Sequence, residues 1–338
     1  MKTYFLLALF LLAQPTWAQL FQLTSISTGI NSSFRGLSVV NNQVAWVSGS
    51  NGWVGISTNG GNTWEFNQVK GHETSGFRSL YAFDEHRAII ANAGSPTNIL
   101  ITADAGKTWK VVYTNNHEAA FIDGIDFWNE KEGLIYGDPI DGKMLLLKTS
   151  DGGSTWNEVV TAPQLNEGEA SFAASGTGIR CVGKSLAYLS TGGMTSRFWI
   201  TSDKGNTWNV QTPPIVQGDV ATGIYSFAVY KNNIVLVGGD YTRPALATNH
   251  NLYSDDRGAT WNTPSQPSRG YRECVEFISQ KILLTTGPTG TDISYNQGAS
   301  WKAFSDLEGF HVIRKARKGK LMVIAGNNGQ IGLIKEKE

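Results

Sequence analysis

Apolar and polar residues follow one pattern that recurs along almost the whole chain. A segment that alternates between apolar and polar residues comes first, as at 34–40, 77–83 and 122–128. A short apolar run that ends in glycine follows, as at 44–49, 88–94 and 133–137, and two further short runs complete the unit. Runs of this length between turn residues predict antiparallel strands. The pattern therefore predicts an all-β protein built from four-stranded units.

An eight-residue motif, Ser/Thr-x-Asp/Asn-x-Gly-x-Thr/Ser-Trp, ends the third run of six of these units. Its copies lie at 57–64, 102–109, 149–156, 201–208, 254–261 and 294–301. Their tryptophans are 45, 47, 52, 53 and 40 residues apart. Repeats of about 40–50 residues are typical of β-propeller blades. The spacing therefore predicts a propeller.

The chemistry of the motif indicates a tight turn. We expect its Asp or Asn to accept hydrogen bonds from backbone N–H groups one or two residues further on, and its glycine to adopt a positive φ. We expect its tryptophan to pack between neighbouring sheets. These positions are interpreted as structural: Asn59, Asp104, Asp151, Asp203, Asp256, Asn296, Trp64, Trp109, Trp156, Trp208, Trp261 and Trp301.

Six motifs do not limit the propeller to six blades. The segment 310–334 supplies three more strands without the motif, and 21–27 reads as a strand that belongs to no other unit. An N-terminal strand that completes the last blade would leave the ring without a free edge. We therefore predict a single seven-bladed β-propeller domain over 19–338.

The N-terminus and the charge balance narrow the functional classes. Residues 4–13 are apolar, and Thr16-Trp17-Ala18 is typical of a cleavage site, so 1–18 is predicted to be a signal peptide of a periplasmic or secreted protein. Lys+Arg and Asp+Glu number 28 each, which gives no global attraction to nucleic acid or to anionic membranes. No later apolar segment is long enough to span a bilayer. We expect a monomer that neither binds nucleic acid nor inserts into membranes.

The repeated motif resembles the Asp-box, or BNR repeat, of sialidase-like propellers. With seven blades and a signal peptide, the chain most resembles the photosystem II stability/assembly-factor propellers and their relatives in non-photosynthetic bacteria. This resemblance implies a non-enzymatic factor that binds a protein partner. Sialidases are six-bladed and carry an Arg-Ile-Pro near the N-terminus, whereas Phe34-Arg35-Gly36-Leu37 has no proline. Sialidase activity is therefore disfavoured.

Alignment of the first strands of the seven units gives a column of polar residues. Because the first strand of a propeller blade lines the central channel, this column is predicted to form a polar ring at one mouth. The ring residues are Arg35, Arg78, Asp123, Arg180, Tyr225, Arg272 and His311. Topology places the loops after the second strands and the connections between blades at the same mouth. They contribute Asp138, Arg197, Asp240, Tyr241 and Arg243, together with the long stretch 161–178.

Several arginines at one mouth favour an anionic ligand, because guanidinium groups bind carboxylates in a bidentate manner. The preferred ligand is an acidic or carboxylate-bearing segment of a protein partner, and an acidic glycan is the alternative. A further interpretation is structural: the arginines pair with Asp123, Asp138, Asp240 and Glu169 and order the mouth. Under the glycan alternative the protein is a glycoside hydrolase or lyase, but no spacing selects a catalytic pair of carboxylates.

The chain contains no signature of a cofactor. It has no Gly-rich dinucleotide-binding motif and no Cys-x-x-Cys. The pairs His72-Glu73 and His117-Glu118 lie in different connections, so no metal site is predicted. In the predicted register Cys181 and Cys274 point to opposite faces of their strands, which argues against a disulfide.

Overall fold

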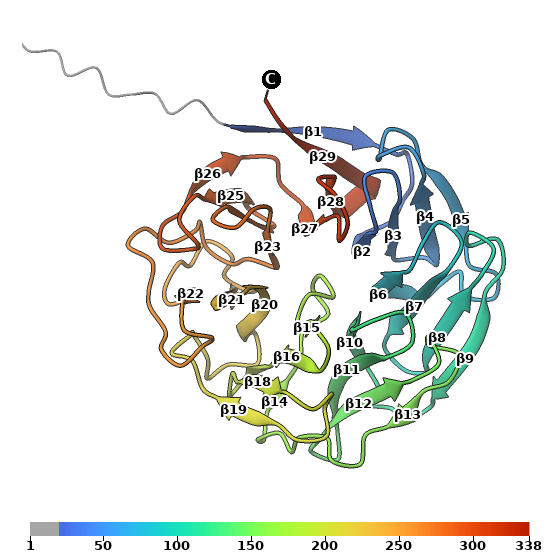
Figure 1. The fold of residues 1–338 in the computed structure, drawn as a ribbon, viewed down its shortest axis with the longest axis horizontal. Helices are drawn as coiled ribbons and strands as arrows, with labels where there is room; N and C mark the ends of the chain where they lie inside the picture. The colour runs from blue at the N-terminus through green and yellow to red at the C-terminus, as the bar shows by residue number, and fades with distance from the viewer. Residues whose placement is uncertain (1–19, 338) are drawn as a thin grey trace, which may run out of the picture.

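The computed structural model describes residues 20–337, which form seven antiparallel sheets arranged in a ring (Figure 1). The fold is a seven-bladed β-propeller, as the repeats predict. The predicted signal peptide, 1–18, lies outside the described residues. Among the described residues no helix is long and apolar enough to cross a membrane.

Four strands make up each of the first three blades. Blade 1 contains β2 (Phe34–Val39), β3 (Ala45–Gly49), β4 (Trp53–Ser57) and β5 (Glu65–Gln68). Blade 2 contains β6 (Gly76–Ala82), β7 (Ala88–Ala93), β8 (Thr97–Thr102) and β9 (Lys110–Asn115). Blade 3 contains β10 (Ile122–Phe127), β11 (Gly133–Ile140), β12 (Lys143–Thr149) and β13 (Asn157–Glu158).

The remaining blades vary this plan. Blade 4 contains β15 (Ile179–Val182), β16 (Leu186–Ser190), β18 (Phe198–Thr201) and β19 (Asn209–Gln211). Blade 5 contains β20 (Thr222–Tyr230), β21 (Asn233–Asp240) and β22 (Asn251–Ser254), and its sheet continues from β20 to the short strands β17 (Gly192–Gly193) and β14 (Glu169–Ala170). Blade 6 contains β23 (Cys274–Phe277), β24 (Leu283–Gly287), β25 (Gly290–Ser294) and β26 (Lys302–Ser305). Blade 7 contains β27 (Phe310–Lys315), β28 (Met322–Gly326) and β29 (Gln330–Glu336), with the 3-10 turn η1 (Asn327–Gly329) between the last two.

The two ends of the chain meet in blade 7. The strand β1 (Phe21–Ser27) pairs with β29 in antiparallel register from Phe21 opposite Glu336 to Ser27 opposite Gln330. Figure 1 shows this blue strand beside the red C-terminal strand. The predicted closure of the ring by an N-terminal strand is therefore confirmed.

The hydrophobic core lies between adjacent blades. One cluster joins Trp46 of blade 1 to Phe77 and Ile90 of blade 2, and all three side chains are fully buried. Burying an aromatic or aliphatic side chain of this size contributes about 1.5–3 kcal/mol, so each blade interface is a substantial source of stability. The first strand of every blade faces the centre of the ring (Figure 1).

The six motif turns share one face of the ring. A backbone N–H in each turn donates to the turn between the first and second strands of the same blade, as Gly60 does to Gln43 and Ala105 does to His86. We name this the Asp-box face. The opposite face, where the first strands begin and the second strands end, is the mouth face.

Candidate functional site

Five residues of the predicted ring occupy the same structural position. In blades 1, 2, 3, 5 and 7 the pairing between the first and second strands shifts by one residue near the mouth. The extra residue lies on the first strand, and a β-bulge of this kind redirects a side chain. The residues at the five shifts are Arg35, Arg78, Asp123, Tyr225 and His311.

In blade 6 the ring position belongs to Glu273, not to Arg272 as the sequence alignment predicts. The Glu273 N–H donates to the Thr286 carbonyl, and the next residue, Cys274, pairs with Thr286, so Glu273 is the extra residue. Arg272 is fully buried and pairs with Asp292. The predicted register is therefore wrong by one residue in this blade.

In blade 4 Arg180 lies in a second layer of the channel. This blade has no register shift, and Arg180 pairs directly with Tyr188 of β16. Its guanidinium lies 3.0 Å from Glu276 Oε2, and Arg314 lies 3.5 Å from the same oxygen. Glu276 and Arg314 each come three residues after a ring residue, so the prediction that Arg180 belongs to the ring is also wrong.

Three ring residues form a charged cluster. Glu273 Oε2 accepts a hydrogen bond from His311 Nδ1 at 2.5 Å and lies 3.4 Å from Arg35 Nη1. Burial raises the pKa of Glu273, but Arg35 and His311 outweigh burial and hold this pKa below its ordinary value. The cluster spans blades 1, 6 and 7 and keeps Glu273 ionised.

The stretch 161–178 does not simply border the mouth, because its residues 171–177 cross the channel. We call these residues the channel segment. The channel segment contacts four blades. The Arg35 side chain donates to the Ala174 carbonyl at 2.6 Å, and the ring of Phe172 stacks on Tyr225 at 3.8 Å. The Ser175 hydroxyl donates to the Glu273 carbonyl at 2.6 Å, and the Arg314 side chain donates to the Gly176 carbonyl at 3.4 Å. In Figure 1 a light-green loop beside β15 reaches towards the centre of the ring. The ring is therefore partly covered by the chain itself.

Two carboxyl groups lie beneath the channel segment. Asp123 is fully buried, and neither of its oxygens has a hydrogen-bond partner of good geometry among the described residues. Burial, and then the charge of Asp138, raise the pKa of Asp123 well above its ordinary value. Asp138 accepts a hydrogen bond from the Ser171 N–H at 2.8 Å, and burial raises the pKa of Asp138 to about 6.

The arginines of the mouth differ in how well they are paired. Arg197 makes a bidentate contact with buried Glu169, at 2.5 and 2.9 Å, and Arg243 Nε lies 2.7 Å from Asp240. Glu169 and Asp240 are therefore paired, but with arginines of the loops and not, as the structural interpretation expects, with arginines of the ring. Arg78 makes no hydrogen bond or ion pair with any described residue. Burial, and then the charge of Arg35, lower its pKa.

Exposed apolar side chains lie over blades 4 and 5, in the loops that contain Arg197 and Arg243 and in a connection hydrogen-bonded to both loops. We call them the mouth shelf: Met194, Val220, Tyr241 and Leu246, which are 49%, 68%, 54% and 38% exposed. The Gly218 N–H donates to the Gly193 carbonyl and joins the loops of Val220 and Met194, and the Val216 N–H donates to the Asn249 carbonyl and joins the loop of Val220 to that of Leu246. Only Tyr241 was predicted as a site residue. No sequence motif marks Val220 or Leu246, and the loops that contain them differ from the other loops only in length.

Part of the chain matches a known protein family, and its fold matches several solved structures. Residues 91–224 match the family model of the photosynthesis system II assembly factor YCF48. A solved structure of YCF48 bound to D1 peptide is 16% identical, covers 93% of this chain and 97% of its own, and has a TM-score of 0.63. The YCF48 of Cyanidioschyzon merolae is 14% identical, with coverages of 92% and 98% and a TM-score of 0.61. A search of curated proteins gives no match.

The chain is a seven-bladed Asp-box propeller, and its residues 91–224 resemble the photosystem II assembly factor YCF48. The GH74 enzyme of Niastella koreensis also shares the fold, at 15% identity and a TM-score of 0.59. It covers 86% of this chain but only 50% of its own. At these identities the solved structures show a common fold alone, and the site must be judged from its own residues.

The Asp-box turns are held by internal hydrogen bonds, but these hydrogen bonds differ from those predicted. The Asp104 carboxylate accepts from the N–H of Thr108, four residues further on, and from the Thr108 hydroxyl. Gly106 has a φ of 77°, as predicted. Trp109 lies edge-on to Trp46 of blade 1 at 6.5 Å, so the tryptophan packs between neighbouring sheets.

The hydrogen bonds from Thr108 and Thr102 lower the pKa of Asp104 to about 2. The same bonds to Thr207 and Thr201 lower the pKa of Asp203 to about 2, and those to Thr260 and Ser254 act likewise on Asp256. Hydrogen bonds within its own turn thus stabilise the charged form of each carboxylate. This favours a structural role for the Asp-box face of blades 2 to 5.

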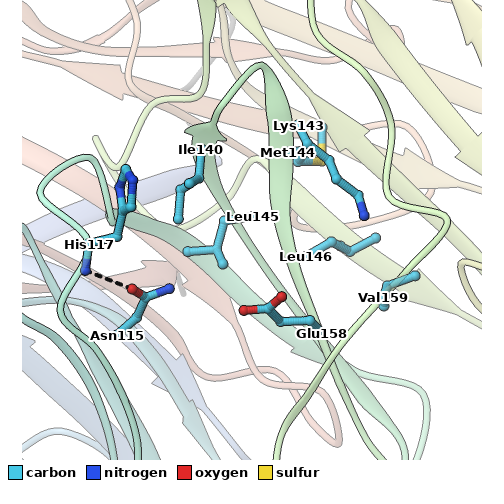
Figure 2. Close-up of a pocket in the computed structure, with 9 residues that line it drawn as sticks. All are labelled: Asn115, His117, Ile140, Lys143, Met144, Leu145, Leu146, Glu158 and Val159. Carbon is cyan, nitrogen blue, oxygen red and sulfur yellow. Dashed lines mark hydrogen bonds between the residues drawn. The ribbon is translucent and has the colours of Figure 1, made fainter.

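His117 lines a small open pocket on the mouth face, between the connection after β9 and the strand β12. Figure 2 shows His117 and Asn115 on one side, Leu145 in the middle and Lys143 on the other side. The pocket holds about 260 Å³, below the usual range for ligand sites. Lys143 already bonds to the carbonyl of Val160 at 2.6 Å. Among the described residues no group of three His, Cys, Asp or Glu is placed to hold a metal ion.

Both cysteines are free thiols, in agreement with the prediction against a disulfide, although the register on which that prediction rests is wrong in both blades. Cys181 packs in the core between blades 3 and 4, and Cys274 hydrogen-bonds to the backbone of Ile313. Burial raises the pKa of both thiols. Neither is an activated nucleophile.

Proposed function

We propose that this chain is an exported, non-enzymatic factor that binds a carboxylate-bearing segment of a protein partner on its mouth face. In this role it supports the assembly or stability of an envelope or membrane complex. The signal-peptide pattern of 1–18 motivates the exported location. The peptide named with the solved YCF48 structure motivates the class of ligand, because that relative shares the fold.

The observation that carries the proposal is the position of the mouth shelf beside incompletely paired arginines. Exposed apolar side chains next to a cationic group are typical of peptide sites, where apolar anchors supply affinity and charges supply register. Arg78 has no hydrogen-bond partner among the described residues, and the Arg243 side chain is 64% exposed. A peptide carboxylate can be bound by either guanidinium while its apolar side chains contact Tyr241 and Met194.

The channel segment sets the form of this site. Because residues 171–177 fill the space between the first strands, a partner lies across the mouth and does not thread through the ring. The corrected ring gains Glu273 and loses Arg180 and Arg272, which reduces its positive charge. We therefore propose that the carboxylates of the partner contact Arg243, beside the mouth shelf, and Arg78. Arg180 and Arg272 are not part of this site.

The experiment is a comparison of captured partners followed by peptide binding. Tagged wild-type protein is compared with an Arg78→Gln/Tyr241→Ser/Arg243→Gln variant in pull-downs from the exporting organism. A Lys107→Gln/Lys131→Gln variant on the Asp-box face is the matched control. Overlapping peptides of each captured protein are then titrated by fluorescence anisotropy.

We expect an acidic peptide to bind the wild type and the control equally, and the mouth variant at least tenfold more weakly. Peptides that bind all three proteins equally would contradict the proposal. Each variant is checked by thermal unfolding, so that a loss of binding is not a loss of fold.

The glycoside hydrolase or lyase alternative rests on Asp123 and Asp138, whose raised pKa values would suit an acid catalyst. We assign them no catalytic role, because Asp123 is fully buried beneath the channel segment and a glycan cannot reach it. Turnover of an acidic polysaccharide that is abolished by Asp138→Asn would contradict this assignment.

A further inference from the structure

A cavity of about 580 Å³ opens on the Asp-box face at blade 7. We call it the closure pocket. Blade 7 has no Asp-box, because β29 runs to the C-terminus and β1 arrives from the N-terminus. The pocket lies beside the ends of these two strands and is bounded on one side by Asn59 and Asn62 of the blade 1 Asp-box. It is therefore a consequence of how the ring is closed.

The interior of the closure pocket is apolar. Its apolar lining residues are Phe21, Ile278, Ile282, Leu321, Met322 and Ile334. They come from blades 6 and 7, and most are buried, so they form a fixed surface. A volume of 580 Å³ lies within the range of ligand sites and accommodates one or two large apolar side chains.

Three lysines surround this apolar interior: Lys315, Lys320 and Lys335. None of their ammonium groups makes a hydrogen bond or an ion pair with any described residue. The acid that lines the pocket is Glu336. The closure pocket therefore carries unneutralised positive charge in a protein whose overall net charge is zero.

The neighbouring Asp-boxes add to this asymmetry. Blades 2 to 5 carry Asp at the third motif position, but the boxes of blades 1 and 6, on either side of blade 7, carry Asn59 and Asn296. Asn59 still accepts the Thr63 N–H at 3.0 Å, so the turn is maintained without a negative charge. The positive charge around blade 7 is thus not opposed by the flanking turns.

We propose that the closure pocket is a second docking site, which binds a protein segment with an apolar side chain next to one or more carboxylates. The apolar side chain enters the pocket, and the lysines bind the carboxylates. At its edge Asn42 Oδ1 already accepts from the Lys320 and Leu321 N–H groups, and Asn62 Nδ2 donates to the Asn59 carbonyl. The Gln43 amide, the Asn42 Nδ2 and the Asn62 Oδ1 are left to hydrogen-bond a peptide backbone. This concave shape with amide groups suits a peptide better than a flat lipid surface.

This inference is independent of the mouth site, since the two sites lie on opposite faces. A partner bound at both faces would gain affinity through multivalency, and two partners could be bound at once. Either arrangement suits a factor that brings polypeptides together.

The test uses a fluorescein-labelled peptide, Asp-Leu-Glu-Phe-Leu with a free C-terminal carboxylate, titrated against the whole protein by anisotropy. The pocket variant is Lys315→Glu/Lys320→Glu/Lys335→Glu. Its control, Lys107→Glu/Lys110→Glu/Lys131→Glu, changes the net charge equally with exposed lysines of blades 2 and 3. An Ile282→Trp variant fills the pocket without changing the charge, and Arg78→Gln/Arg243→Gln reports on the mouth.

We expect the pocket variant and Ile282→Trp to weaken peptide binding at least tenfold, while the charge control binds as the wild type does. No measurable binding of the peptide to the wild type would overturn the inference. Binding that is lost in the charge control as strongly as in the pocket variant would also overturn it. So would lysine-dependent binding to phosphatidylglycerol vesicles in the absence of peptide binding, because the site would then recognise lipid. Loss of binding in the mouth variant alone would overturn it while supporting the mouth site.

Discussion

The Glu273 carboxylate accepts a hydrogen bond from His311 Nδ1 at 2.5 Å, although the two residues belong to different blades. Arg35 approaches the same oxygen from a third blade. The inner strands of blades 6, 7 and 1 are therefore tied together through one buried carboxylate. This contact defines the true register of the ring and separates Glu273 from its neighbour Arg272, which points to Asp292.

Replacing Glu273 by Gln tests this register. We expect the free energy of unfolding to fall by about 3 kcal/mol, because Arg35 and His311 lose a buried charged partner. The change is measured by chemical denaturation. In a double-mutant cycle with Arg35→Gln the two effects should couple by about 1 kcal/mol, and strict additivity would show that the two side chains do not interact.

The titration of Asp138 should make the free energy of unfolding depend on pH between pH 3.8 and about 6. Its pKa is about 6 in the folded protein against an ordinary 3.8, so the folded state binds more protons than the unfolded state in this window. The free energy of unfolding should therefore decrease by roughly 2 kcal/mol as the pH rises through the window. Asp138→Asn stays neutral and keeps an acceptor for the Ser171 N–H, so this part of the pH dependence should disappear in denaturation curves. An unchanged profile would contradict the raised pKa.

The Asp-box carboxylates should have the opposite pH dependence. The folded pKa of Asp104 is about 2 against an ordinary 3.8, so its contribution is complete above pH 3.8 and is lost as the pH falls through 2. Asp104→Asn should be nearly neutral at pH 7, since Asn59 maintains the same turn, and should lose the acid dependence. Asp104→Ala removes the acceptors and should lower the melting temperature at pH 7. Thermal unfolding at pH 7 and pH 3 separates these cases, and equal effects of Asn and Ala at pH 7 would argue against the hydrogen-bond account.

The strand β1 should be required for a stable ring. Deletion of residues 19–27 leaves β29 with an unpaired edge, and such edges promote association between chains. We expect a lower melting temperature and the appearance of oligomers in size-exclusion chromatography with light scattering. A truncated protein that stays monomeric with an unchanged melting temperature would show that the closure adds little.

The blades could be predicted from the sequence because each repeats the same local signals. Six units share the same turn residues, an apolar run that ends in glycine and a tryptophan at the same motif position. A wrongly assigned strand in one unit can therefore be recognised by comparison with the other units. Even the closing strand 21–27 was identified, because it was the only strand-like segment left without a partner. The hydrogen bonds of the turn were less predictable, since the acceptor reaches four residues further on and not one or two.

The ring could be predicted only in part, because a β-bulge adds one residue that alternation cannot detect. In blade 6 two charged residues, Arg272 and Glu273, stand next to each other, and the polar pattern fits either. In blade 4 the bulge is absent, so Arg180 moves to a second layer. The channel segment and the mouth shelf could not be predicted, because long-range packing of irregular loops determines both.

Photo-crosslinking at Tyr241 tests the central claim most directly. The crosslinking residue p-benzoylphenylalanine replaces Tyr241 on the mouth shelf and, in a control, exposed Val210 on the outer strand β19. The proteins are expressed in the exporting organism and irradiated there. The proposed mouth site predicts a discrete crosslink to an acidic segment of a specific partner from position 241, and none from position 210. Equal crosslinking from both positions, or the same partner captured only from position 210, would contradict a binding site on the mouth face.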